Sequence, residues 1–85
     1  MKQIYDSLED SPNYPDDFYP VQDGTRRLKV KNQFLLAELR NVEPGEWRKV
    51  YQDGYSVGEP VSIHYFESRS GKVFDVKIKS EWSNQ

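Results

Sequence analysis

The chain has 85 residues, of which 35 % are hydrophobic and 31 % charged, and it contains one histidine and no cysteine. This length supports one small domain. The missing cysteines exclude disulfides and thiolate chemistry, and the single histidine excludes a multi-histidine metal site. The longest apolar run, Phe34 to Ala37, is too short to span a membrane, and no signal segment opens the chain. We therefore expect any chemistry to use acid–base side chains without a bound cofactor.

The charge is divided unevenly along the chain. Residues 1–25 hold one basic and six acidic residues, a net of about −5, whereas residues 26–85 hold eleven basic and eight acidic residues, about +3. The division predicts a proline-rich acidic N-terminal arm, residues 1–25, joined to a compact, weakly basic domain, residues 26–85. Two interpretations of the arm stay open: a solvated tail, or a segment that links a phosphate-binding body to a partner.

The first predicted elements are short. Lys2 to Glu9 has the pattern of a short helix, and the prolines between residues 12 and 20 then interrupt regular structure. Asp23-Gly24 has the composition of a turn. From Arg26 to Lys31, basic residues alternate with Leu28 and Val30, which favours a short strand or an extended segment.

The clearest local signals lie between residues 32 and 45. Asn32 is a good N-cap, and Leu35, Leu39 and Val42 share one helical face. Because Pro44-Gly45 would end the element, we expect a helix from about Gln33 to Asn41.

Three strands are expected after this helix. They cover Trp47 to Gln52, Val61 to Glu67 and Lys72 to Lys79, with a tight turn at residues 68–71 between the last two. The predicted fold is α+β: one main helix packed on a small antiparallel three- to four-stranded sheet, with the extended acidic arm.

Alternation in the last hairpin predicts its register. With Glu67 opposite Lys72, the opposed pairs Val61–Ile78, Ile63–Val76 and Tyr65–Phe74 are all apolar and form the core face.

The same register places His64 opposite Asp75 and Ser62 opposite Lys77 on the other face. A carboxylate across the ladder would fix the imidazole tautomer and raise the pKa of His64.

The orientation of the first strand is left open by the long Asp53–Pro60 loop. We prefer Trp47, Lys49 and Tyr51 on the His64 face because Val50 suits the core; the alternative turns Arg48, Val50 and Gln52 outward.

These residues match the needs of a metal-independent ribonuclease. Such an enzyme takes a proton from the 2'-hydroxyl, returns one to the leaving 5'-oxygen and stabilises the phosphate charge. We expect His64 to act as general acid or base, with Asp75 orienting it. The predicted catalytic residues are His64, Asp75, Lys77, Lys49 and Tyr51, and the predicted substrate-binding residues are Arg48, Ser62, Lys79, Arg26 and Arg27. The competing interpretation is a surface histidine paired with a neighbour.

The sequence also resembles a known group of bacterial toxins. The run Glu43 to Gly54, followed by Val61 to Ser68 and Ser70 to Lys79, resembles the extreme C-terminal domains of polymorphic toxins. These domains are the variable tips of Rhs-repeat, filamentous-haemagglutinin-like and contact-dependent inhibition proteins. The resemblance extends to Tyr5, Tyr14-Pro15, Phe18 and Leu35-Leu36.

The resemblance implies a toxin domain that is secreted as the tip of a larger carrier and acts in the cytoplasm of a neighbouring bacterium. It implies cleavage of tRNA or rRNA and neutralisation by a cognate immunity protein, with no membrane partner and no DNA sequence recognition.

Two alternatives remain. One is a non-enzymatic interaction module that binds a protein through the sheet face with Phe66 and Val73. The other is a small immunity or antitoxin protein, consistent with the pI of about 5.3.

Overall fold

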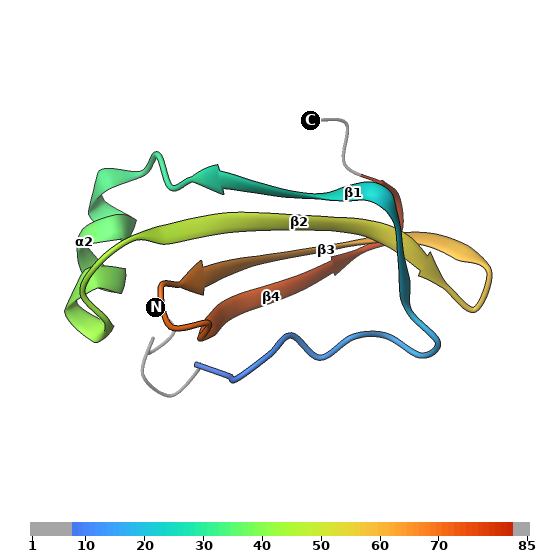
Figure 1. Ribbon diagram of the computed structural model, residues 1–85, viewed down its shortest axis with the longest axis horizontal. Helices are drawn as coiled ribbons and strands as arrows, with labels where there is room; N and C mark the ends of the chain where they lie inside the picture. Colours follow the sequence, from blue (N-terminus) through green and yellow to red (C-terminus); the bar gives the residue numbers. More distant parts are fainter. Residues whose placement is uncertain (1–7, 83–85) are drawn as a thin grey trace.

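Four antiparallel strands pair in chain order into one sheet, with one α-helix at its end (Figure 1). The computed structural model describes residues 8–82. Its elements are β1 (Tyr19–Lys29), α2 (Gln33–Val42), β2 (Trp47–Ser56), β3 (Glu59–Ser68) and β4 (Val73–Lys79). The α+β class is therefore confirmed.

The structure differs from the prediction for the N-terminal part of the chain. The boundary expected between residues 25 and 26 falls inside β1, which contains the predicted Asp23-Gly24 turn as an irregularity between Pro20 and Thr25. The helix expected from Lys2 to Glu9 lies almost entirely outside the described residues.

The predicted helix is confirmed, with its N-cap. The Asn32 side chain accepts hydrogen bonds from the backbone N–H groups of Phe34 and Leu35, both at 3.1 Å. Such a cap contributes about 1 kcal/mol. The buried helix positions are Leu36 and Leu39, so the core face is rotated slightly from the one we expected.

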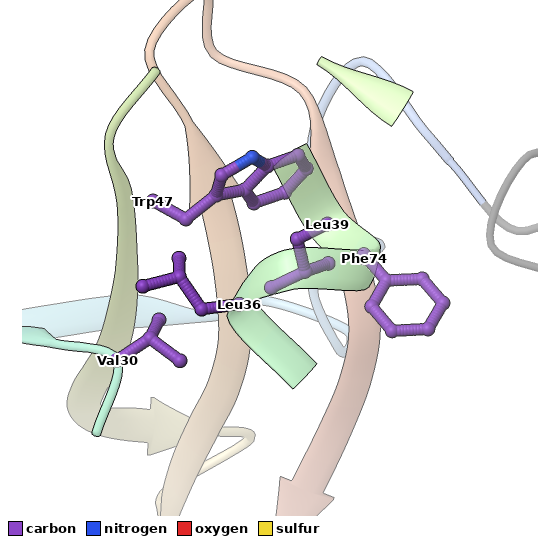
Figure 2. Packing of buried hydrophobic residues seen from close by; sticks show 5 residues of the cluster. All are labelled: Val30, Leu36, Leu39, Trp47 and Phe74. Carbon is purple, nitrogen blue, oxygen red and sulfur yellow. The ribbon is translucent and has the colours of Figure 1, made fainter. Parts of the chain in front are cut away.

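Helix α2 covers one end of one sheet face. Its core cluster consists of Val30, Leu36, Leu39, Trp47 and Phe74 (Figure 2). We call this side of the sheet the helix-side face; on β2 it carries Trp47, Lys49 and Tyr51, as preferred above. Trp47 does not point into solvent, however. It is 2 % exposed because α2 packs over it.

The opposite face is covered by the N-terminal segment, residues 8–18. The core on this side is Val50, Ile63, Tyr65 and Val73, with Phe18 packed against it. Two backbone hydrogen bonds of 2.9 Å join Glu9 to Val73, and the segment runs along the sheet from there (Figure 1). The sheet is therefore protected on both sides, but only part of the helix-side face is covered.

The register predicted for β3 and β4 is wrong. Glu67 pairs with Val73 instead of Lys72, and His64 pairs with Lys77 instead of Asp75. The turn is one residue longer than expected, and Asp75, with φ of 58°, adds a β-bulge.

This shift also moves core residues. Phe74 joins Phe66 on the helix-side face, Val73 is buried on the opposite face, and Ile78 is 51 % exposed.

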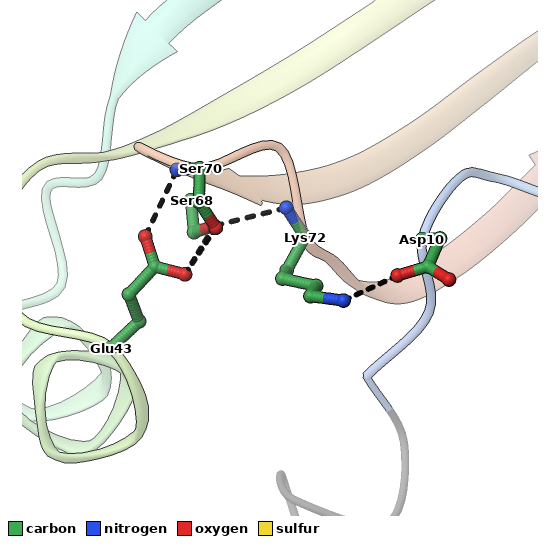
Figure 3. A network of polar contacts seen from close by, with 5 residues as sticks. All are labelled: Asp10, Glu43, Ser68, Ser70 and Lys72. Carbon is green, nitrogen blue, oxygen red and sulfur yellow. Dashed lines mark hydrogen bonds and ion pairs between the residues drawn. The ribbon is translucent and has the colours of Figure 1, made fainter.

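Side-chain contacts fix the longer turn (Figure 3). The Glu43 carboxylate, at the end of α2, accepts hydrogen bonds from the Ser70 backbone N–H at 2.9 Å and its hydroxyl at 2.6 Å, and from the Ser68 hydroxyl at 3.0 Å. These bonds lower the pKa of Glu43, the Ser70 hydroxyl most of all. Lys72 forms an ion pair with Asp10. The register thus depends on contacts between distant segments.

The β2–β3 hairpin is tighter than expected. Ser56 pairs with Glu59, so the turn contains only Val57 and Gly58, with φ of 50° and 79°. Two consecutive positive φ angles are typical of a type I′ turn. The predicted loop is therefore mostly strand, and Asp53 and Gly54 lie within β2.

Candidate functional site

The uncovered part of the helix-side face carries a row of four polar side chains, one from each strand. Arg26 pairs with Tyr51, Tyr51 with His64, and His64 with Lys77. The Tyr51 and His64 rings meet edge-on at 4.6 Å, and the Arg26 guanidinium lies 5.5 Å from the centre of the Tyr51 ring. The strand pairing therefore places His64 between the Tyr51 ring and Lys77, with Arg26 on the far side of Tyr51.

A hydrogen-bond chain connects His64 to a buried carboxylate. The Ser62 hydroxyl donates to Asp53 Oδ1 at 2.6 Å, and Ser62 Oγ lies 2.9 Å from His64 Nε2. Ser62 has no exposed surface, and Asp53 is 9 % exposed. Asp53 also lies 3.9 Å from the Arg26 guanidinium.

This chain determines the imidazole tautomer. A hydroxyl has one hydrogen, and Ser62 gives it to the Asp53 carboxylate, so Ser62 must accept the hydrogen bond from His64. The neutral imidazole therefore carries its proton on Nε2 and its lone pair on Nδ1. The buried Ser62 is not a nucleophile, because it lies between Asp53 and His64, whereas in a hydrolase triad the histidine lies between.

The surroundings of His64 keep it neutral. Burial lowers its pKa from the ordinary value of 6.5, and Lys49, Lys79 and Arg26 lower it further, against an opposing effect of Asp53. The prediction that Asp75 raises the pKa of His64 is therefore wrong. A neutral imidazole is able to accept a proton at pH 7.

Lys49 packs against two aromatic rings of the site. Its ammonium lies 4.2 Å from the centre of the Phe66 ring and 6.0 Å from that of Tyr51. Burial lowers its pKa, as do Lys77 and Lys79, while Asp75 raises it. Lys49 is thus a cation that gives up its proton more readily than an exposed lysine.

The predicted site residues divide between the two faces. His64, Lys49, Tyr51, Ser62, Lys77, Lys79 and Arg26 share the helix-side face. Asp75 lies 3.7 Å from Lys77 and does not pair with His64. Arg27 and Arg48 lie on the opposite face, where Arg27 contacts Glu67 at 3.4 Å; Arg48 contacts Glu46 at 2.5 Å.

Asp53 is the residue that sequence reasoning missed. We had placed it in the Asp53–Pro60 loop because Asp-Gly resembles a turn. The usable signal was Gly58, which suits a two-residue hairpin turn and would have extended both strands to bring Asp53 opposite Ser62.

The site is an open surface. A cavity of about 410 Å³ lies on the opposite face; among the residues that line it, the Gln52 side chain donates hydrogen bonds to the hydroxyls of Tyr14 and Tyr65. Among residues 8–82, no three histidine, aspartate or glutamate side chains gather as a metal site. An open cationic face suits a polymer better than a small molecule.

Comparison with known proteins adds no relatives. The chain matches no protein-family model, and no curated protein or solved structure is significantly similar to it.

Within the described part of the chain, no helix is long and apolar enough to cross a membrane.

Proposed function

We propose that the chain is an antibacterial toxin domain that cleaves tRNA or rRNA as a metal-independent ribonuclease. The observation that carries the proposal is the environment of His64: its Nε2 contacts Ser62, which is bonded to Asp53, and the charges of Lys49, Lys79 and Arg26 act on its imidazole. The resemblance to polymorphic-toxin tips supports the biological setting.

In this proposal His64 is the general base. Its Nδ1 accepts the proton of a ribose 2'-hydroxyl while the 2'-oxygen attacks the adjacent phosphorus. The bond from phosphorus to the 5'-oxygen breaks, which leaves a 2',3'-cyclic phosphate and a 5'-hydroxyl. Lys49, whose pKa is lowered, gives the proton to the 5'-oxygen, and Tyr51 is the alternative donor.

The remaining cations hold the phosphate. Lys77 and Lys79 extend from the same face as His64, and their charges stabilise the dianionic transition state. Asp53 and Ser62 are positioning residues because they act only through the imidazole.

The distribution of acids favours RNA on this face. Asp10, Asp16 and Asp17 belong to the segment that covers the opposite face. They repel a polyanion from that side, although the chain is acidic overall. We also propose that an immunity protein blocks the cationic face.

The test is cleavage of total bacterial RNA by the purified protein in EDTA. The expected products carry 2',3'-cyclic phosphate ends, and His64→Gln lowers the rate about 10²–10⁴-fold. Lys49→Ala and Lys29→Ala make a matched pair, since each removes one cation but Lys29 lies on the opposite face. Only Lys49→Ala should slow cleavage. Full activity of His64→Gln would overturn the proposal.

A second candidate is a non-enzymatic interaction module. The binding face that we predicted for it is wrong, because Phe66 and Val73 lie on opposite faces of the sheet and Val73 is buried. The Phe34 side chain favours this candidate, because this aromatic ring is 89 % exposed on α2. No cleavage by the wild type, together with tight binding of a protein that Phe34→Ala abolishes, would support this function. Expression in a susceptible cell distinguishes a toxin from a small immunity protein, because a toxin arrests growth and an immunity protein does not.

A further inference from the structure

Three aromatic side chains gather on the helix-side face beyond the polar row. Tyr19 and Tyr55 oppose each other on β1 and β2, with ring centres 5.5 Å apart. Trp82, three residues after β4, contacts Tyr55 edge-on at 5.3 Å. We call these three residues the aromatic cluster.

The cluster is both fixed and accessible. The Trp82 indole N–H donates to the Gly54 carbonyl at 2.8 Å, which sets the position of the ring. Nevertheless Tyr19 is 56 % exposed and Trp82 39 % exposed. An exposed group of adjoining aromatic rings is typical of a binding surface.

The absence of a side chain at Gly54 allows the β1 backbone at Tyr19 to lie close to β2. A Cβ on Gly54 would lie 2.3 Å from the Tyr19 carbonyl oxygen and 2.8 Å from the Phe18 ring. The glycine therefore lets β1 approach β2 closely enough for Tyr19 to meet Tyr55.

The aromatic cluster adjoins the proposed cleavage site. Tyr55 and Tyr51 lie on the same face of β2, four residues apart, which is roughly 13 Å at ~3.3 Å per residue. Asp53 lies between them on the same strand. Lys79, paired with Ser62, leads from His64 toward Trp82.

We propose that the aromatic cluster is a nucleobase-binding subsite, in which one unpaired base of single-stranded RNA stacks on Trp82 or Tyr19. This inference rests on the proposed function and names its substrate class. Aromatic rings beside a cationic strip bind single strands because every base has a stacking face and the phosphates follow the cations. A base paired in a duplex is unavailable, so the subsite selects loops or single-stranded ends.

The two tryptophans of the chain provide the assay. Trp47 is 2 % exposed beneath α2, so a ligand that quenches tryptophan fluorescence acts on Trp82. The protein is the full chain with His64→Gln, which prevents cleavage during titration. The probes are hexauridylate and a hexamer of abasic ribose phosphate, which has the same charge but no bases.

Hexauridylate should quench the fluorescence and bind about 5- to 150-fold more tightly than the abasic hexamer, the range typical of one stacked base. Because Trp82 is itself the fluorescent reporter, its variants are titrated by isothermal calorimetry, in which Trp82→Ala should lose most of this preference. Trp82→Phe should retain part of the preference, which separates loss of stacking from loss of the fold. Urea unfolding of each variant provides the structural control.

The two proposals fail in different ways. Equal binding of both hexamers, or binding without quenching, overturns the subsite even if the wild type cleaves RNA. Base-dependent quenching by a protein whose wild type cleaves no RNA overturns the ribonuclease and leaves the subsite standing. Duplex RNA that binds as tightly as hexauridylate also contradicts the subsite.

Discussion

Ser62→Ala is the most informative single substitution in the protein. It removes one oxygen atom from a fully buried side chain and breaks two contacts at once, the 2.6 Å hydrogen bond to Asp53 and the 2.9 Å contact with His64 Nε2. The backbone and Cβ are retained, so the effect reports the hydroxyl itself.

The expected loss of stability follows from the charge on Asp53. A hydrogen bond to a charged group contributes about 1.5–3 kcal/mol, and the carboxylate left behind is buried. A loss of 1 kcal/mol lowers Tm by roughly 4–8 °C in a domain of this size. We therefore expect Ser62→Ala to lower Tm by roughly 6–24 °C and to shift the urea midpoint without changing the slope.

The tautomer of the His64 imidazole can be measured separately from stability. Because the chain has one histidine, ¹⁵N NMR of labelled protein shows a single imidazole. At neutral pH the wild type should show the Nε2–H tautomer with a proton protected from exchange with water. In Ser62→Ala that protection should be lost.

Ser56→Ala is the matched control. The Ser56 hydroxyl donates to the Asp16 carbonyl at 2.7 Å, a neutral acceptor in an exposed position. This variant should lose no more than about 1.5 kcal/mol and leave the imidazole spectrum unchanged. The reasoning is refuted if Ser62→Ala is no less stable than Ser56→Ala and its imidazole spectrum matches the wild type.

Three further predictions concern other parts of the fold. Val57→Asn should stabilise the protein by about 1 kcal/mol in urea unfolding, since valine is strained at φ of 50° whereas asparagine tolerates it; a lower midpoint would contradict this. Leu39→Ala should cost about 2–5 kcal/mol because Leu39 has no exposed surface, whereas Phe34→Ala should change stability by less than about 0.5 kcal/mol; equal losses would refute the packing described for α2. The lowered pKa of His64 means that the unfolded chain binds its proton more readily, so stability should fall as the pH drops below the ordinary value of 6.5 and level off below the folded pKa. Urea midpoints of the wild type and His64→Gln, measured against pH, should differ in that window, and parallel curves would contradict the lowered pKa.

Elements with local signals were predictable from the sequence. Helix α2 begins at an asparagine cap and ends before Pro44, and both signals lie within the helix and its immediate flanks. The prediction that Lys49 and Tyr51 lie on the His64 face is confirmed. An apolar Val50 was expected to be buried, and side chains alternate along a strand, so its two neighbours had to lie on the other face.

The β3–β4 register was not predictable because no local residue determines it. Glu43, at the end of α2, sets the turn through Ser68 and Ser70, which follow it by 25 and 27 residues. The bulge depends on Asp75 with a positive φ angle, which nothing in its sequence neighbourhood indicates. Apolar alternation alone therefore chose a register that was internally consistent but wrong.

Asp53, which is connected to His64 through Ser62, was missed for a related reason. Asp53-Gly54 resembles a turn, yet here the glycine is required within β2 by the close approach of Tyr19 and Phe18. A glycine needed for space and a glycine needed for a bend look the same in the sequence.

The β2–β3 hairpin has a consequence for how this chemistry is inherited. Asp53, Ser62 and His64 all come from one pair of neighbouring strands joined by two residues. The hydrogen-bond chain therefore draws its three residues from these two strands, and neither α2 nor the N-terminal segment supplies one of them. If His64 is the base that we propose, substitutions elsewhere in the chain would change the surrounding cations while the base and its positioning residues are inherited together in one hairpin.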